Sequence, residues 1–315
     1  MIIHPISEAE LERFGIFDDG QGPLLCSQLK DAWRTGKTKA EWCLVAEHAG
    51  GWAGRVLLNA AVTPIFIHFF DVDWSRDNAD AIARDLIGAT IKAAKREAER
   101  DLLYALDEPH PWHSQPDRRR RLFADAGFTV AREALRWQWP QGSPAPTEGS
   151  RLMYRTIAEV GEDAYRDAIA RVSDGTLDAR LRAMRSRLGR DGDAAEHLRV
   201  LRGLSQEPSQ LQLGFDRNGE LVGLFAGGAT DGIAIVAYVG VVAEKRGQRY
   251  GDELLVHGTQ FLLDSGEDVI RADTDVANVP MARAFERVGY LNFAKRTELV
   301  LTATALKQPR PDADH

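Results

Sequence analysis

Helical and strand periods alternate along the second half of the chain. Apolar residues at helical spacing mark 248–264, with Leu254, Leu255 and Phe261 on one stripe. Similar patterns cover 279–288 and 157–204, the latter with breaks near 173–175 and 189–192. Strand patterns occupy 211–216, 220–227, 233–242, 268–274 and a last stretch that ends near residue 303. This half therefore predicts an α+β arrangement, a mixed sheet flanked by helices.

The first half repeats this order of elements. Its helical patterns lie at 22–37, 78–99 and 117–126, and its strand patterns at 42–47, 52–58, 65–72, 101–106 and 128–139. A helix end, a glycine and an aromatic residue recur around Gly127 and Gly289, and a strand–turn–strand pattern recurs around Gly54 and Gly223. The offsets are 289 − 127 = 162 and 223 − 54 = 169. We expect a duplicated unit, with chance similarity as the alternative.

A proline- and glycine-rich stretch separates the halves. Residues 141–150, QGSPAPTEGS, contain no large apolar residue, and their prolines disfavour helix and strand alike. The expected domains are therefore 1–140 and 151–306, joined by this linker and followed by a flexible tail at 307–315.

Composition narrows the possible classes of function. Forty Lys and Arg against 47 Asp and Glu give a net charge of −7, which provides no general attraction to nucleic acid or anionic lipid. Cys26 and Cys43 have neither disulfide-scaffold nor metal-ligand spacing. No apolar run reaches the ~18 residues of a membrane helix, and the N-terminus is unlike a signal peptide. We expect a cytoplasmic protein without a metal or membrane anchor, and its net charge disfavours nucleic acid as a partner.

The segment with the clearest chemistry lies between an apolar strand and an amphipathic helix. The strand ends near Val242, and a turn rich in Gly and Arg leads into the helix. Backbone N–H groups at a helix start favour anions, and Gly247 and Gly251 let a ligand approach the backbone. Lys245, Arg246 and Arg249 add positive charge. The pattern predicts a phosphate or pyrophosphate site, with an ordinary strand–turn–helix corner as the alternative. It is neither a Walker loop nor GxGxxG.

This turn resembles the Arg/Gln-x-x-Gly-x-Gly/Ala signature of the GNAT superfamily, the GCN5-related N-acetyltransferases. Residues 246–251 read Arg-Gly-Gln-Arg-Tyr-Gly, with Arg249 in place of the common fourth-position Gly. Downstream, 273–290 is similar to the family's strand, its Asn and its helix ending in Gly-Tyr/Phe. The resemblance covers about 212–301. The size and layout resemble those of tandem GNAT enzymes such as the mycothiol synthases.

The resemblance implies two tandem GNAT-like domains, each a mixed, mostly antiparallel sheet flanked by helices. Acetyl-CoA would bind where the fourth and fifth strands separate, with its pyrophosphate on the turn and its pantetheine along the fourth strand. The implied coenzyme A contacts are Gly240, Val241, Val242, Arg246, Gly247, Gln248, Arg249, Tyr250, Gly251, Asp252, Asn278 and Phe285.

The resemblance leaves the catalytic groups open. Acetyl transfer needs a free amine, a polarised thioester carbonyl and a proton for the thiolate. A backbone N–H near Val241 or Val242 would polarise the carbonyl. Many relatives have a proton-donating Tyr where this chain has Phe285, so Tyr238 is the expected acid, with a core aromatic as the alternative. Asp273 and Asp275 are candidates for a base or a cation contact, although Asp275 suits a cap. Glu196 and His197 are weaker candidates.

The first half lacks the corresponding turn. Between 71 and 80 it has no glycine but four carboxylates, which would repel a pyrophosphate, so this half is expected not to bind coenzyme A. The run 118–121, four arginines, is expected to form a solvated helix face, with a phosphate or RNA contact as the alternative. The chain is expected to be a monomer built as a pseudo-dimer, or a homodimer.

These features favour an acyl-CoA-dependent N-acyltransferase that transfers acetyl directly from acetyl-CoA to a primary amine of a small molecule. Two alternatives remain at this point: a non-catalytic coenzyme A-binding regulatory module, suggested by Phe285, and a transferase that uses a tRNA-linked donor. The sequence does not identify the acceptor.

Overall fold

A computed structural model describes residues 1–16, 22–59, 64–95, 99–147, 149, 151–230 and 232–307, with side chains omitted at residues 16 and 22–26. The chain divides into two compact units, and each is discontinuous in sequence. Unit 1 comprises Met1–Ala131 and Arg296–His315, and unit 2 comprises Arg132–Lys295. Each unit is described by itself.

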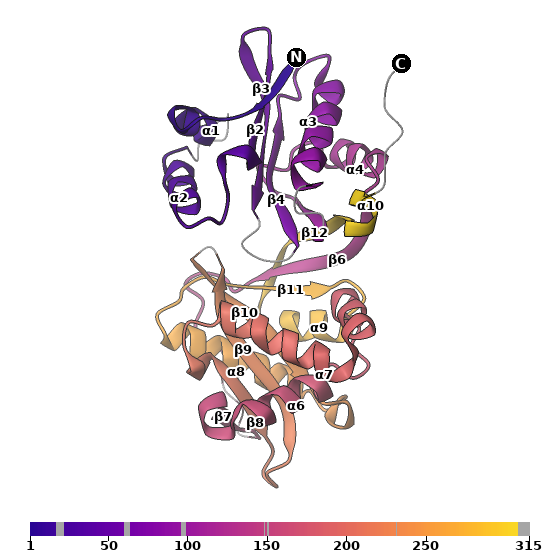
Figure 1. The fold of residues 1–315 in the computed structure, drawn as a ribbon. Coiled ribbons are helices and arrows are strands. Elements are labelled where there is room, and N and C mark those ends of the chain that lie inside the picture. The colour runs from indigo at the N-terminus through magenta and orange to yellow at the C-terminus, as the bar shows by residue number, and fades with distance from the viewer. Residues whose placement is uncertain are drawn as a thin grey trace. The chain divides into compact units, whose positions relative to one another are not determined.

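Unit 1 contains a mixed sheet with helices on both faces. Its strand order is β1 (Ile2–Pro5), β2 (Cys43–His48), β3 (Gly51–Asn59), β4 (Ile65–Val72), β5 (Leu102–Glu108) and then β12 (Leu291–Leu301), whose residues from 296 onward belong to this unit. Neighbouring strands from β1 to β4 are antiparallel, whereas β4 and β5 are parallel. Figure 1 shows α1 (Leu11–Ile16) and α2 (Gly22–Arg34) on one side of the strands, and α3 (Ala79–Ala94) and α4 (Pro116–Asp125) on the other.

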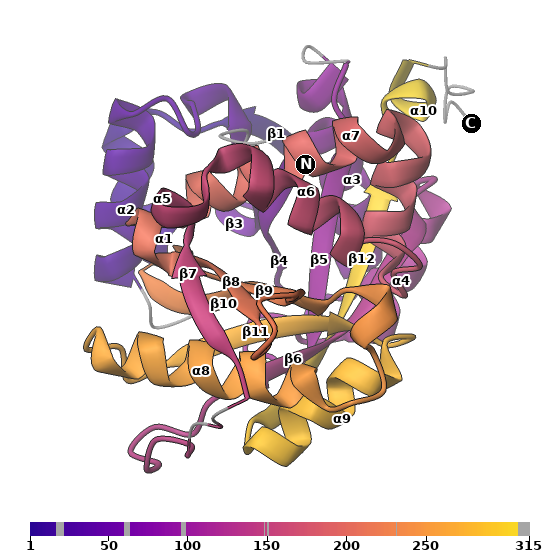
Figure 2. The same ribbon diagram turned by 90° about the horizontal axis from the view of Figure 1, so that it is seen from below.

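Unit 2 repeats this layout. Its strand order is β6 (Thr129–Gln138, from residue 132 onward), β11 (Ile270–Asp275), β10 (Ile233–Val241), β9 (Leu221–Thr230), β8 (Leu211–Phe215) and β7 (Met153–Thr156). Figure 2 shows α5 (Ile157–Val160), α6 (Glu162–Val172) and α7 (Ala179–Leu204) on one side of the sheet, and α8 (Tyr250–Asp264) and α9 (Val279–Val288) on the other. The helix α7 is kinked at Gly189, where φ is 72°.

The predicted α+β fold, a mixed sheet flanked by helices, is confirmed, and so is the repeated order of elements. The strand registers show the repeat residue by residue. Gly54 lies opposite Val72 on β3 and β4, and Gly223 lies opposite Val241 on β9 and β10, with the same offset of 169 for both positions. Apolar side chains fill the space between each sheet and its helices, which is what holds each unit together.

The last strand of each half contributes to the other half's unit. Residues 134–138 of β6 pair with β11 in unit 2, whereas Leu299 and Leu301 of β12 are buried in the core of unit 1. The expected domains, 1–140 and 151–306, are continuous and therefore differ from these units. Of the expected linker, 141–147 has neither helix nor strand, and residues 148 and 150 lie outside the described residues.

Some short elements were not expected. These are β1, α1, β7 and α10 (Ala303–Lys307), each six residues or fewer, and the 3-10 turns Glu8–Glu10, Ala40–Trp42, Pro208–Gln210 and Ala243–Lys245. Of the expected flexible tail, Lys307 ends α10, and 308–315 lie outside the described residues. Within the described ranges, no helix is both long and apolar enough to cross a membrane.

Candidate functional site

The strands β10 and β11 are paired only at their beginnings. Ala234 lies opposite Ile270, and Ile235 lies opposite Arg271. Beyond this point β10 continues to Val241 and β11 to Asp275 without further pairing between them. The two strands therefore separate toward their carboxyl ends, which leaves one edge of β10 without a neighbouring strand.

A β-bulge determines which backbone groups lie on that edge. The register between β9 and β10 shifts at Ala237, between Val236 and Tyr238. The N–H of Val242 donates to the carbonyl of Val222 on β9 at 2.9 Å. Since backbone groups alternate sides along a strand, Gly240 and Val242 face β9, whereas Val239 and Val241 face the separated edge. Of the three expected contacts on this strand, only Val241 has its backbone groups there, and Val239 was not expected.

Gly240 is needed for packing. A Cβ at Gly240 would lie 2.2 Å from Cγ1 of Val172 on α6, well inside van der Waals contact. The absence of a side chain at Gly240 thus lets α6 approach the sheet beside the separated edge.

The turn after β10 presents a series of free backbone donors. Gly247 has a φ of 80° and Arg249 a φ of 62°, and α8 begins at Tyr250. Within the described residues, the N–H groups of 247–251 donate no hydrogen bond, as is usual for the first turn of a helix. A Cβ at Gly251 would find no atom closer than 3.9 Å. The expected turn residues Gly247, Gln248, Arg249, Tyr250 and Gly251 therefore form one open cradle at the positive end of a helix dipole.

Two of the three basic side chains of this turn, Lys245 and Arg246, have partners within the protein. Lys245 pairs with Asp216 at 2.9 Å and with Glu220 at 2.5 Å. Arg246 donates to the carbonyls of Val241, Val172 and Asp174 at 3.1, 2.9 and 2.7 Å. These bonds fix the end of α6 to the turn. Arg249 has no carboxylate within salt-bridge distance in the described part of the chain, so its charge remains available.

The remaining expected coenzyme A residues have structural partners. Asp252 accepts two hydrogen bonds from Arg287 of α9, at 2.8 and 2.6 Å. Asn278 is the N-cap of α9, and its side chain accepts from the N–H of Met281 at 3.4 Å. Phe285 is 1% exposed and stacks on Trp137, with ring centroids 5.5 Å apart. Its ring is part of the core between the sheet and α9.

Tyr238 lies in a polar cluster between β10 and the helices α6 and α7. Its hydroxyl is 3.1 Å from Oγ of Ser173, and its ring lies 4.6 Å from the ring of His197. Burial raises the pKa of Tyr238 to about 12. The hydroxyl is therefore protonated at neutral pH, as a proton donor must be. His197 is buried, its Nδ1 has no hydrogen-bond partner in the described structure, and burial lowers its pKa to about 4.

Asp193 adds a buried carboxylate to this cluster. Its side chain is fully buried, neither oxygen has a hydrogen-bond partner among the described residues, and Arg185 lies 3.7 Å away. Burial raises the pKa of Asp193 above its ordinary range, and the nearby Arg185 opposes that rise. Such a group normally has a partner, which marks this cluster as a functional candidate.

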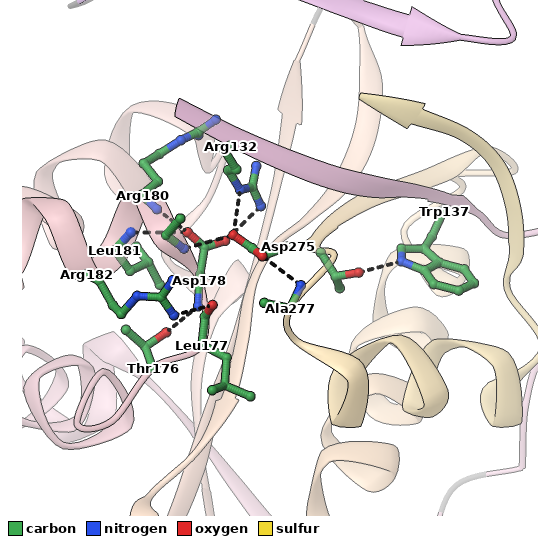
Figure 3. Close-up of polar contacts among 12 residues, drawn as sticks. Arg132, Trp137, Thr176, Leu177, Asp178, Arg180, Leu181, Arg182, Asp275 and Ala277 are labelled. Carbon is green, nitrogen blue, oxygen red and sulfur yellow. Dashed lines mark hydrogen bonds and ion pairs between the residues drawn. The ribbon is translucent and has the colours of Figure 1, made fainter. Parts of the chain in front are cut away.

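Asp275 anchors the start of α7, as Figure 3 shows. One of its oxygens accepts from the N–H of Ala179 and the other from the N–H of Ala277, both at 2.8 Å. Arg132 links it to Asp178, the N-cap of α7, to which Arg132 donates at 2.8 Å. Asp275 therefore acts as a cap, the alternative considered above. Asp273 is partly exposed and accepts from Arg136 of β6 at 3.2 Å.

Unit 1 has the same separated strands, but an arginine occupies the region beside them. The pairing between β4 and β5 covers only 65–67, and a bulge at His68 matches the one at Ala237. Arg119 is 1% exposed and donates to the carbonyl of Phe70 on β4 and to the hydroxyl of Tyr104 on β5. At the offset of 162, Arg119 corresponds to Met281 of unit 2. The side chain of Arg119 thus forms a hydrogen bond with the separated edge of β4.

The carboxylates around the start of α3 in unit 1 also have partners within the protein. Asp73 accepts from the N–H and hydroxyl of Ser75, and Asp80 pairs with both Arg118 and Arg121. Arg120 pairs with Glu108 and Asp117. The expectation of a solvated face at 118–121 was therefore wrong for Arg119, because helical spacing places it on the same buried face as Leu122 and Phe123. Arg121 is exposed, as expected.

Sequence reasoning missed Ser173, Asp193 and Arg185, and gave His197 little weight. A usable signal exists for two of them. Asp193 and His197 stand four residues apart on α7 and share its buried face with Ala194, Leu198 and Leu201. A charged residue at an apolar helical position is the pattern to look for. Among the residues that the structure describes, no group of three or more His, Cys, Asp or Glu is arranged to hold a metal ion.

Comparison with known proteins agrees with this geometry. Residues 179–290 match the model of the acetyltransferase (GNAT) family. No curated protein sequence matches the chain. A GCN5-related N-acetyltransferase from Sphaerobacter thermophilus has a TM-score of 0.62 at 15% identity, covering 96% of this chain and 95% of that one. A tandem GNAT protein from the clavulanic acid pathway gives 0.51 at 16%, covering 85% and 83%. A GCN5-related N-acetyltransferase from Kribbella flavida gives 0.52 at 19%, covering 79% and 87%. At these identities the structural likeness establishes the tandem fold.

Proposed function

We propose that this chain is an acyl-CoA-dependent N-acyltransferase that works through unit 2, because residues 179–290 match the model of the GNAT acetyltransferase family. In its simplest form it transfers acetyl from acetyl-CoA to a primary amine of a small molecule. One observation carries the proposal. The separated edge of β10 and the free N–H groups of 247–251 lie at the two ends of one short turn.

The residues present suit the two halves of the cosubstrate. The N–H cradle at 247–251, with the unpaired Arg249, would hold the pyrophosphate. The N–H of Val241 and the carbonyl of Val239 would pair with the amide groups of the pantetheine arm, as a peptide pairs with a strand edge. In unit 1, Arg119 occupies the equivalent edge, and we propose that unit 1 does not bind coenzyme A.

The same residues support direct transfer. A neutral amine nitrogen attacks the thioester carbon, a C–N bond forms, and the C–S bond breaks as the thiolate leaves, while the amine nitrogen loses one proton to solvent. The N–H of Val239 also faces the separated edge and can donate to the carbonyl oxygen as it becomes negative. Tyr238 is our candidate to protonate the thiolate. Asp273 remains a candidate cation contact, whereas the hydrogen bonds of Asp275 give it a capping role.

Two measurements test the proposal. Acetyl-CoA at millimolar concentration should raise the melting temperature of the protein, because a ligand that binds only the folded state stabilises it. With a suitable amine, the protein should release free thiol faster than the background reaction. Absence of any stabilisation would rule out the proposal. Stabilisation without turnover of any amine would instead favour a coenzyme A-binding regulatory module.

A further inference from the structure

A small pocket opens where α6 leads into α7. Its volume is about 230 Å³, a size suited to part of a small molecule. The lining residues are Ser173, Gly175, Thr176, Arg182, Arg185 and Ser186.

The pocket borders the candidate site. Ser173 lines it and also contacts the hydroxyl of Tyr238 at 3.1 Å. Arg246, from the turn that starts the cradle, donates to the carbonyls of Val172 and Asp174 on either side of Ser173. A molecule that reaches from this pocket toward Tyr238 would therefore approach the end of β10, where the acetyl group is proposed to lie.

The lining residues include two cationic side chains and no anionic one. Three hydroxyls also line the pocket. Arg185 already pairs with Asp174 and lies near Asp193. Arg182 donates one hydrogen bond, to the carbonyl of Leu177 at 2.7 Å, as Figure 3 shows. No carboxylate lies within salt-bridge distance of Arg182 in the described residues, and a guanidinium has five N–H donors. The pocket therefore presents a free cation.

We propose that the acyl acceptor is an amine that also carries an anionic oxygen group, a carboxylate or a phosphate, which Arg182 binds in this pocket. The inference rests on the proposed function. An arginine recognises both anions through paired N–H donors, and the hydroxyls of Ser173, Thr176 and Ser186 can add hydrogen bonds. The neighbouring acidic groups have partners of their own: Asp174 pairs with Arg185, and Asp178 pairs with Arg132.

Matched pairs of amines test this proposal. In two of the pairs the members have nearly the same shape and differ in charge: α-amino acids with their amides, and β-alanine with β-alaninamide. In the third, O-phosphoethanolamine is compared with ethanolamine, which lacks the whole phosphate group. Thiol release and thermal stabilisation are measured for each, with acetyl-CoA or coenzyme A present. We expect at least one acid to exceed its neutral partner by tenfold or more in kcat/KM. The amino acid and phosphate pairs identify which anion is preferred.

The variant Arg182→Gln should abolish that preference by raising the KM for the acid about tenfold or more, while the neutral partner changes little. Arg182→Lys should restore part of it. Arg187→Gln, an exposed arginine on the same helix that does not line the pocket, is the matched control. Equal use of acids and neutral amines, or an unchanged ratio in Arg182→Gln, would overturn the inference.

Stabilisation by acetyl-CoA separates this inference from the proposed function. It is measured first, in wild type and in Arg182→Gln, and should be equal in the two. If acetyl-CoA stabilises both proteins but no acid is preferred, only the acceptor assignment fails. If acetyl-CoA stabilises neither, the proposed function fails.

Discussion

Tyr238 can be separated from its neighbour Tyr165 by its position. Tyr165 is fully buried and donates to the carbonyl of Phe225 at 3.1 Å, whereas Tyr238 is partly buried and contacts Ser173 beside the proposed acetyl position. If Tyr238 protonates the thiolate, Tyr238→Phe should lower kcat by about a hundredfold or more, with little change in acetyl-CoA affinity. Tyr165→Phe is the control and should keep its kcat. Steady-state kinetics would contradict the assignment if Tyr238→Phe turned over at the wild-type rate.

His197 should make the stability of the protein depend on pH. Its folded pKa of about 4 lies below the ordinary value of 6.5, because burial disfavours the imidazolium. Asp178 raises this pKa and Arg180 lowers it, but neither outweighs the burial. The unfolded chain therefore binds a proton first as the pH falls, and stability is lost between about pH 6.5 and pH 4.

The measurable effect is the difference between wild type and His197→Gln. Between pH 7 and pH 5, His197 should contribute a loss of about 2 kcal/mol in the free energy of unfolding. Urea titrations at the two pH values should show this loss in wild type and lack it in the variant. The comparison cancels His113, whose pKa is also lowered to about 4 by burial. Parallel pH dependences in the two proteins would show that His197 is not neutral and buried.

Gly54 on β3 and Gly223 on β9 occupy equivalent positions, but the space around them differs, which gives a prediction at the level of elements. A Cβ at Gly223 would lie 2.2 Å from the carbonyl oxygen of Gly240, whereas one at Gly54 would lie 3.0 Å from that of Asp71. Relief at Gly223 requires a shift of the strand backbone. Gly223→Ala should therefore lower the free energy of unfolding by about 3 kcal/mol or more, and Gly54→Ala should lower it clearly less. Gly203→Ala, in a helix with open space around it, should be neutral or stabilising by up to about 1 kcal/mol.

Chemical denaturation of the three variants measures these differences. An equal loss of unfolding free energy in Gly223→Ala and Gly54→Ala would contradict the difference in backbone spacing between the two positions. Gly203→Ala also guards against a general sensitivity of unit 2 to added volume, since Gly203 lies in the same unit as Gly223.

Elements and sites differ in how far the sequence predicts them. The long periodic segments gave the right order of helices and strands, since each pattern is local. The turn at 246–251 was predictable for the same reason. It was not predictable that Val239, rather than Gly240, has its backbone groups on the separated edge. The bulge at Ala237 reverses which residues face that edge. The pocket around Arg182 is lined by residues 173–186 alone, but it forms only when α7 packs against α6, and no local pattern specifies that packing.

At the scale of the whole chain, the contribution of β12 to unit 1 predicts an effect far away in sequence. Leu301 is 2% exposed in the core of unit 1, and Arg296 donates twice to Asp107 of β5, at 2.7 and 2.8 Å. Leu301→Ala should lower the free energy of unfolding by about 2–5 kcal/mol and should speed the exchange of backbone amide hydrogens in β5. Val300→Ala, at a half-buried neighbouring position, is the control. Faster exchange confined to β10 and β11 would contradict the assignment of β12 to unit 1.

The duplicated fold carries one proposed coenzyme A site, so one chain should bind one acetyl-CoA. Unit 2 offers five free N–H groups at 247–251, whereas in unit 1 Arg119 occupies the strand edge and Asp80 neutralises the helix start. Isothermal titration should give a stoichiometry of one. Gly251→Asp places a negative side chain in the cradle and should weaken binding by about tenfold or more. Asp80→Asn removes a carboxylate from the corresponding helix start and should leave both affinity and stoichiometry unchanged. Two sites per chain, or a loss of affinity in Asp80→Asn, would show that unit 1 also binds the cosubstrate.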